Sequence, residues 1–200
     1  YIARERADVR VVVLTGAADL IQRGNYPAYF SIPEQAIPLI EYSWKNQAPM
    51  LYGRFDFAYD GQDIKMLEYN ADTPTGLLEA SVAQWHWIEQ VENIVNRDQF
   101  NSIHEDLIER WKTLYRPNTT VHFAACQSAG REDWGNLEYL MDTAFQAGLN
   151  VSELSMENIG WDGQELVDLN EKTIQHLFKL YPWEWVWEED FSQFLTPQTE

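Results

Sequence analysis

Hydrophobic and polar residues alternate most regularly over residues 51–70. The runs LYGRFDFA and IKMLEYN place apolar side chains at nearly every second position, and YDGQD separates the two runs. A period of two predicts half-buried strands, and Asp60-Gly61 is typical of a tight turn between antiparallel strands. The pattern therefore predicts a β-hairpin with one apolar face and one polar face.

Helical spacing of apolar residues follows the hairpin. We expect Thr75 to cap a helix over LLEASVAQWHWIEQVENIV, with Glu79 in its first turn. The apolar stripe of this helix consists of Leu78, Val82, Trp85, Ile88 and Val91. Ser102 and Glu105 predict a capping box for the next helix, IHEDLIERWKTLY, which Arg116-Pro117 closes.

The segments before the hairpin have weaker patterns. Residues 7–23 mix β-branched residues with a late helical pattern, which favours a helix that ends near Gly24. The run QAIPLIEYSW, which follows Pro33 and Glu34, predicts a short helix disturbed by Pro38.

The second half of the chain alternates between strand and helix patterns. VHFAAC predicts a buried strand, GNLEYLMDTAFQAG a helix that ends at Gly148, NVSELSM a second strand, and residues 174–179 a third. A βαβ unit predicts parallel pairing. The fold class is therefore mixed α/β, with an antiparallel hairpin portion and helices over residues 1–117 and a small parallel subdomain over residues 118–200.

Charge and composition exclude several classes of protein. Fourteen basic and thirty-two acidic side chains give a formal charge of −18. This charge repels nucleic acid and anionic lipid and attracts cations such as polyamines. An excess of acidic residues also serves solubility. No apolar run is long enough to span a membrane, and the start lacks the apolar core of a signal peptide. The single cysteine, Cys126, lies in an apolar run and is interpreted as a buried, inert thiol, which fits a reducing cytoplasm.

The polar face predicted for the hairpin gathers chemically related side chains. Arg54 and Asp56 share this face on the first strand, and Met66, Glu68 and Asn70 share it on the return strand. A turn centred near residue 61 places Arg54 roughly opposite Glu68, with Asp56 one step along. We therefore expect four polar groups to converge on one patch.

This patch permits two interpretations. Asp56, Glu68 and Asn70 supply the carboxylate and amide oxygens that Mg²⁺ prefers, and Arg54 could hold a transferring phosphoryl group beside the metal. Alternatively, the hairpin simply exposes charge to water, and Arg54 and Glu68 form a cross-strand ion pair worth well under ~1 kcal/mol. Spacing alone leaves both open.

Several motifs resemble those of one enzyme family. RFDF and EYNAD, followed by VHFAAC, REDW, QAG, WDG and LFKLYPWEW, occur here in the order found in the synthetase domain of glutathionylspermidine synthase and its bacterial relatives of uncharacterised activity. That family consists of ATP-grasp carbon–nitrogen ligases. The resemblance covers most of residues 30–190 and is most specific from RFDF to EYNAD.

The resemblance implies roles for individual residues. By resemblance, Asp56, Glu68 and Asn70 bind two Mg²⁺ ions. Arg54 lies beside these ions and the ATP phosphates and stabilises the transition state. Thr73 follows the Asn-Ala-Asp step, at a position where a hydroxyl residue helps to hold glutathione. The candidate substrate-binding residues are Thr73, Thr75, Glu132 and Asp133.

This chain also departs from the family pattern. Threonines 73 and 75 stand where the family's synthetases have serines, and Leu180 stands where they have a threonine. These differences place the chain nearer the uncharacterised relatives than the proven synthetase. They leave open which carboxylate and amine are joined.

The implied function is an ATP- and Mg²⁺-dependent acid–amine ligase that forms an acyl phosphate and then an amide. Its substrates would be a glutathione-like peptide carboxylate and a polyamine or another amine. The chain lacks a glycine-rich phosphate loop, starts without methionine and stops after an aromatic-rich run, so we expect a segment of a longer protein that is inactive alone. The alternatives are a catalytically silent nucleotide- or cation-binding module and, less compatible with Arg54 and Asn70, a glycoside hydrolase that uses Asp56 and Glu68.

Histidines and tryptophans carry no site prediction. The four histidines, which are His86, His104, His122 and His176, have no spacing that suits zinc. The tryptophans of the WHW and YPWEWVW runs are interpreted as packing residues, and an exposed aromatic patch is expected where the chain is cut from a longer protein.

Overall fold

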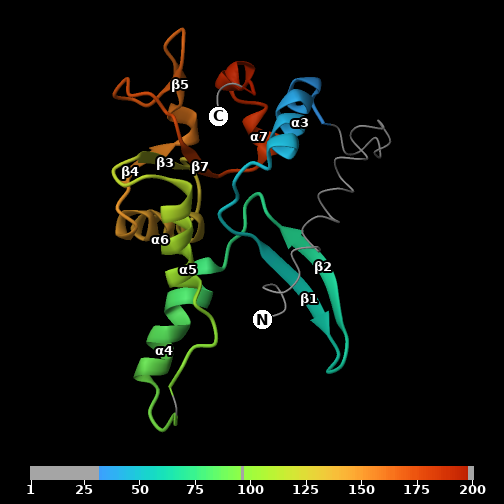
Figure 1. The fold of residues 1–200 in the computed structure, drawn as a ribbon, viewed down its shortest axis with the longest axis vertical. Coiled ribbons are helices and arrows are strands. Elements are labelled where there is room, and N and C mark those ends of the chain that lie inside the picture. Colours follow the sequence, from blue (N-terminus) through green and yellow to red (C-terminus); the bar gives the residue numbers. More distant parts are fainter. Residues whose placement is uncertain (1–31, 96, 198–200) are drawn as a thin grey trace. The chain divides into compact units, whose positions relative to one another are not determined.

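The computed structural model describes residues 32–95 and 97–197 (Figure 1). These residues belong to two compact units, of which one contains residues 32–48 and 195–197 and the other is Pro49–Phe194. The helix predicted over residues 7–23 lies outside the described residues. The boundary predicted after residue 117 falls within the second unit, and that division stays a prediction.

The first unit contains a 3₁₀ turn, η1 (Glu34–Ala36), that runs into helix α3 (Ile37–Asn46). Pro38 lies in the first turn of α3, where the missing N–H would have had no partner inside the helix. The expectation that Pro38 disturbs this helix is therefore wrong. The helix ends at Asn46 and is followed by Gln47, whose backbone is left-handed with a φ of 51°.

The second unit holds the predicted hairpin and parallel sheet (Figure 1). Its elements are β1 (Arg54–Tyr59), β2 (Ile64–Asn70), the π-helical turn η2 (Glu79–Ala83), α4 (Gln84–Gln90), α5 (Ile103–Leu114), β3 (Thr120–Ala125), α6 (Arg131–Gln146), β4 (Asn150–Ser155), η3 (Met156–Asn158), β5 (Gly160–Trp161), β6 (Leu166–Val167), β7 (Leu177–Leu180), α7 (Trp183–Val186) and η4 (Asp190–Phe194).

The parallel sheet has the order β4–β3–β7, and both pairings are parallel as predicted. β3 lies in the middle, and its residues 121–125 are all buried, because helix α6 and strand β4 follow it in a βαβ arrangement. Helix α6 ends at Gln146, and Gly148 terminates it as expected, two residues later, with a φ of +88° that suits glycine. The third strand begins at Leu177, three residues after the predicted start.

The core of this unit forms between the sheet and helices α5 and α6. Phe123 of β3 and Leu140 of α6 are fully buried, and Trp111 of α5 is 2% exposed. The Trp111 ring packs edge-on against Phe123 with centroids 5.7 Å apart, and its Nε1 donates to Thr143 Oγ1 at 3.0 Å. The one polar atom of the large indole is thus satisfied inside the core.

The β1–β2 hairpin has no residue classed as buried, in contrast to β3. Its turn forms because Asp60 Oδ1 accepts hydrogen bonds from the N–H groups of Gln62 and Asp63, and Gly61 adopts a φ of +102°. The short hairpin β5–β6 uses the same device, in which Asp162 Oδ1 accepts from Gln164 and Glu165 and Gly163 has a φ of +105°. The Asp60-Gly61 turn prediction is confirmed.

Two predicted helix starts differ from the structure. Thr75 does not cap the helix that follows it; instead Asn136 Oδ1, from α6, accepts the N–H groups of Leu77 and Leu78 at 3.2 and 3.4 Å. The capping box at Ser102 also fails, because Ser102 Oγ donates to Asp106 Oδ2 and makes no side-chain cap.

The apolar stripe predicted for the first of these helices is only partly correct. Leu78 and Val82 pack against the core, but the π-helical turn at residues 79–83 shifts the helical phase. Leu77 and Ser81 are buried as a result, Trp85 is 38% exposed, and the helix ends at Gln90, before Val91.

None of the helices in the described ranges is both long and apolar enough to span a membrane.

Candidate functional site

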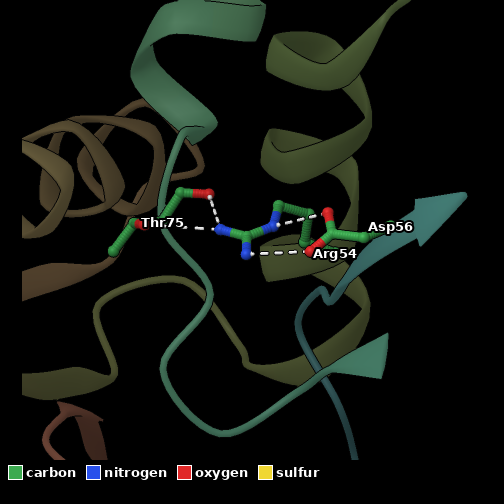
Figure 2. Close-up of polar contacts among 3 residues, drawn as sticks. All are labelled: Arg54, Asp56 and Thr75. Carbon is green, nitrogen blue, oxygen red and sulfur yellow. Dashed lines mark hydrogen bonds and ion pairs between the residues drawn. The ribbon is translucent and has the colours of Figure 1, made fainter. Parts of the chain in front are cut away.

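Arg54 lies at the centre of the candidate site, at the start of β1. Its Nε and Nη2 donate to the two carboxylate oxygens of Asp56 at 3.2 and 3.3 Å, in a bidentate ion pair. On the opposite side its Nη1 donates to the backbone carbonyl and the hydroxyl oxygen of Thr75, at 3.3 and 3.4 Å. Figure 2 shows the guanidinium between these two partners, which joins the strand to the loop that follows β2.

The strand register places the predicted polar groups on one face. Asp56 is directly opposite Glu68, and Arg54 is directly opposite Asn70. Directly opposed residues of an antiparallel pair project to the same side of the sheet, so the four side chains share a face as predicted. The expected pairing of Arg54 with Glu68 is wrong by two residues.

The register error has a local cause. The hydrogen bonds from residues 62 and 63 to Asp60 close the turn and centre it half a residue later than expected. In addition, the register shifts between Asp56 and Phe57, which leaves Leu67 of β2 without a directly opposed residue on β1. Met66 therefore pairs with Phe57 and belongs to the apolar face, contrary to the prediction that it shares a face with Glu68 and Asn70.

The charges around Arg54 are all acidic. The hydrogen bond and the charge of Asp56, followed by the charges of Glu68 and Glu132, raise the pKa of Arg54 above its ordinary value. Glu132 belongs to the first turn of α6, together with Asp133. The charge of a carboxylate more than sixty positions away in sequence thus acts on Arg54. A role for Glu132 in substrate binding stays a prediction.

The loop that connects β2 to the next helix is anchored along its length. Asp72 accepts a hydrogen bond from Lys179 Nζ of β7 and another, at 2.9 Å, from the backbone N–H of Trp183. Tyr52 donates its hydroxyl to the carbonyl oxygen of Pro74 at 2.7 Å. Thr73 and Thr75 therefore lie in a loop that is fixed by the parallel sheet and by the segment before the hairpin.

Two of these anchors are buried polar groups that sequence reasoning missed. Burial lowers the pKa of Lys179, which is partly offset by its bond to Asp72, and Asn136 is 1% exposed. Asn136 also donates its Nδ2 to the carbonyl oxygen of Glu132 at 2.9 Å. Asn136 stands in no motif that marks it. Lys179 lies in the LFKLYPWEW motif and Asp72 in EYNAD, but neither motif by itself indicates that the two side chains pair.

A cavity of about 230 Å³ lies beside this loop. Most of its lining residues are apolar, although they expose nearly as much polar as apolar surface to the cavity. They come from the segment before β1, the loop, α5, β3 and β7 and include Tyr52, Asp72, Pro74, Tyr115 and Phe178. The hydroxyl of Tyr52 is desolvated by burial, which raises its pKa.

The donor set of the hairpin fits Mg²⁺ in its chemistry. Asp56 and Glu68 supply two carboxylates and Asn70 an amide oxygen, and a magnesium site takes its remaining ligands from water and phosphate. Over residues 32–95 and 97–197, no three His, Cys, Asp or Glu side chains gather in a way that could hold a metal by themselves.

Cys126 differs from its predicted environment, whereas two tryptophans of the YPWEWVW run agree with theirs. Cys126 is partly exposed rather than buried, because it follows the end of β3, and its thiol donates to Glu157 Oε1 at 3.1 Å. Trp183 and Trp185 of α7 are 41% and 50% exposed, as expected for an aromatic patch on this segment. Lys179 Nζ lies 4.4 Å from the centroid of the Trp183 ring.

Comparison with known proteins places the chain in a family. The sequence model described as glutathionylspermidine synthase preATP-grasp matches residues 2–200. The chain belongs to this family. The resemblance found in the sequence is thereby confirmed, and the mixed α/β fold agrees with it.

Relatives in this family are longer proteins. A Haemophilus influenzae protein with an inferred acid–amine ligase activity is 50% identical over 94% of this chain and 49% of its own length. The trypanothione synthetase of Crithidia fasciculata is 29% identical over 94% of the chain and 28% of its own length, and the bifunctional glutathionylspermidine synthetase/amidase of Escherichia coli is 26% identical over 93% and 29%. The chain thus spans about half, or less than a third, of these relatives.

A solved structure gives a weaker similarity. It belongs to a Methylobacillus flagellatus protein with an inferred γ-glutamylcysteine synthetase activity and aligns with a TM-score of 0.47 and 12% identity, over 84% of this chain and 39% of that one. The family assignment rests on the sequence matches alone.

Proposed function

We propose that this chain supplies the metal-binding hairpin and part of the acceptor side of an ATP-dependent acid–amine ligase. The observation that carries the proposal is the set of directly opposed pairs, Asp56 with Glu68 and Arg54 with Asn70, on one face of the hairpin. Membership of the glutathionylspermidine synthase family supports the class of reaction.

In this proposal each polar group of the hairpin has a role. Asp56, Glu68 and Asn70 would hold Mg²⁺, which when bound neutralises the charge of the ATP phosphates. Arg54 donates to the oxygens of the phosphoryl group in transfer, and it stays protonated throughout because an arginine does not lose its proton in proteins. Arg54 exchanges some of its bonds to Asp56 for bonds to phosphate, which frees carboxylate oxygens for the metal.

The reaction proceeds in two balanced steps. A carboxylate oxygen of the first substrate attacks the γ-phosphorus of ATP, the bond to the β-phosphate oxygen breaks, and ADP leaves an acyl phosphate behind. The amine of the second substrate then attacks the carbonyl carbon, phosphate departs, and the amine proton is lost as the amide forms. Positioning and charge stabilisation are the main contributions of the protein to such a transfer.

The acceptor side would lie next to the hairpin. Thr73 and Thr75 offer hydroxyl groups to a peptide substrate, and Glu132 and Asp133 offer carboxylates to an ammonium group. A glutathione-like peptide and a polyamine or another amine suit these groups, and the net charge of −18 attracts a cationic amine. The names of the Escherichia coli and Crithidia relatives support this choice of substrates.

The remaining parts of the enzyme would come from a region that corresponds to the unmatched part of the longer relatives. We place the nucleotide-holding lobe there and expect the isolated chain to be inactive, in a protein of the cytoplasm. The matched fractions of 49% and 29% leave ample length for such a lobe.

Activity of the whole protein tests this proposal. Phosphate and ADP release would be followed with ATP, Mg²⁺, glutathione and a panel of polyamines and other amines. Asp56→Asn and Arg54→Lys are each expected to lower kcat by roughly 10²-fold, because each weakens charge stabilisation in the transition state. Asp63→Asn, a change to an exposed carboxylate at the tip of the same hairpin, is the control and should leave kcat unchanged. Equal rates for Asp56→Asn and wild type, or silence on every substrate pair, would refute the proposal.

One observation favours a second candidate, a catalytically silent module that binds nucleotide or cations. Both carboxylate oxygens of Asp56 already accept bonds from Arg54, which satisfies the pair without any ligand. Calorimetry distinguishes the two: binding of ATP and Mg²⁺ without ADP formation supports the silent module, whereas ADP formation that requires both substrates supports the ligase.

A further inference from the structure

The two faces of the β1–β2 hairpin have opposite chemistry. The face that carries Arg54 and Glu68 is charged, whereas the reverse face consists of Phe55, Phe57, Tyr59, Ile64, Met66 and Tyr69. Phe57 is directly opposite Met66, and Tyr59 is directly opposite Ile64, so these four side chains share one side. No charged residue interrupts this reverse face.

The half of this face nearest the turn is open to solvent. We call Phe57, Tyr59, Ile64 and Met66 the hairpin patch; their side chains are 55, 66, 49 and 42% exposed. The half nearest the base is better covered, because the Phe55 ring stacks on Tyr69 at 4.1 Å and on Phe57 at 5.7 Å. The patch therefore continues a stacked aromatic layer outward into solvent.

A contiguous exposed patch of this kind on a soluble domain marks a surface that another element covers. Within the described residues, β1 and β2 pair only with each other, so neither strand gains support from the parallel sheet. A two-stranded ribbon is at best marginally stable in water unless something packs on its apolar face. The hairpin that carries the proposed metal ligands thus needs a cover on its reverse face.

Charge and length identify the cover. A second copy of this chain also has a net charge of −18, so the two copies would repel each other. The Haemophilus relative, which is 50% identical, has about as much polypeptide outside the matched region as inside it. We propose that the hairpin patch is the docking surface for that remaining half of the ligase polypeptide, which covers it with an apolar face of its own.

Site-specific photo-cross-linking in the full-length protein tests this docking surface. Benzoylphenylalanine would replace Phe57 in one variant and Met66 in another, because both positions tolerate a large ring at the surface. The control places the same probe at Phe145, an exposed aromatic residue of α6 that is 66% exposed and far from the hairpin patch in sequence. Mass spectrometry of the digested protein then locates each cross-linked partner residue.

The expected result is that both hairpin probes link to residues beyond position 200 at least about tenfold more efficiently than the Phe145 probe, because the probe reacts only with groups in van der Waals contact. Links to residues 1–31, links between two copies in a mixture of light and heavy protein, or links no more frequent than at Phe145 would each overturn the proposal. The readout does not require turnover, so an inactive protein that gives the expected links refutes the proposed function and leaves the docking surface standing.

Discussion

The β1–β2 hairpin and the β4–β3–β7 sheet belong to the same compact unit but are stabilised in different ways. β3 has five consecutive buried residues, and its Phe123 packs against Trp111 and Phe178. The hairpin has none that is buried, and it is held mainly at its base, where Arg54 binds the Thr75 loop and the Tyr69 ring lies against Gly53. A side-chain Cβ at Gly53 would lie 2.6 Å from atoms of that ring, so a larger residue there would displace Tyr69.

This difference separates stability from chemistry. The proposed ligands are on a hairpin that contributes no buried residue, whereas the helices and the parallel sheet provide a base for the loop that follows it. Substitutions at the proposed ligands are therefore expected to report on activity with little effect on folding.

The largest expected effect contrasts one phenylalanine from each region. In the isolated chain, Phe123→Ala should lower the free energy of unfolding by about 3–5 kcal/mol, because it leaves a cavity at a fully buried position. Phe57→Ala, at a position 55% exposed, should cost less than about 1 kcal/mol. Urea denaturation followed by tryptophan fluorescence measures both, and equal losses would contradict the contrast.

The same pair of variants sharpens the comparison in the full-length protein. If the hairpin patch is covered there, Phe57→Ala should cost more than in the isolated chain, by about 1–2 kcal/mol, because its ring is then removed from a packed interface. The cost of Phe123→Ala should not change between the two lengths of protein.

An intermediate effect is expected at the ion pair that joins the two regions. Lys179→Met removes the ammonium group that donates to Asp72. We expect the free energy of unfolding to fall by about 1–2 kcal/mol, which is less than for a fully buried ion pair because the Asp72 side chain is 35% exposed. The KM for the carboxylate substrate should rise several-fold, since the Thr73 loop loses an anchor. Lys112→Met, which breaks an exposed pair with Glu109, is the matched control and should change neither quantity.

A double-mutant cycle attributes the loss to the pair itself. Asp72→Asn combined with Lys179→Met should cost clearly less than the sum of the two single changes. Strict additivity would show that Lys179 contributes through packing alone.

The smallest expected effect concerns the turn of the hairpin. The N–H groups of Asp63 and Gln62 hold the pKa of Asp60 below its ordinary value, so the ionised form stabilises the folded turn. This stabilisation of the turn is complete above the pKa of Asp60 in the unfolded chain, about 4. It is lost as the pH falls through the lower pKa of Asp60 in the folded chain. Asp60→Asn keeps the acceptor oxygen and should remove this acid dependence.

Hydrogen exchange of the Gln62 and Asp63 amides, corrected for intrinsic rates between about pH 2 and 6, measures the turn directly. Asp162, which forms the equivalent turn of β5–β6 and whose pKa is lowered for the same reason, provides an internal reference in the same sample. Loss of protection in the Asp60→Asn variant at the same pH as in wild type would contradict the assigned cause.

Local patterns predicted the elements better than their connections. The alternation in RFDF and EYN, the Asp-Gly turn, the buried run at β3 and Gly148 at the end of α6 all depend on neighbouring residues, and each is observed. The helix after Thr75 was predicted, but its cap was not, since the acceptor is Asn136, which is 59 positions from Leu77. Thr75 instead accepts from Arg54.

The same limit applies to the candidate site. Sharing of a face follows from strand periodicity, so the convergence of Asp56, Glu68 and Asn70 with Arg54 could be predicted. The displaced register could not, because the irregularity at Leu67 depends on how the two strands twist together. Lys179 and Asn136 were missed because a single buried polar residue has no sequence pattern until its partner in the fold is known.

The alternation of side chains along β1 and β2 also limits how this protein can diverge in length. One residue inserted into the middle of either strand would move every later side chain of that strand to the opposite face of the hairpin. Aromatic side chains would then lie on the charged face and carboxylates on the apolar face, so both faces would be lost. Insertions are expected to be tolerated only at the glycine turn or as an enlargement of the existing irregularity at Leu67. Homologues of different length should therefore keep the spacing from Arg54 to Asp56 and from Glu68 to Asn70 unchanged.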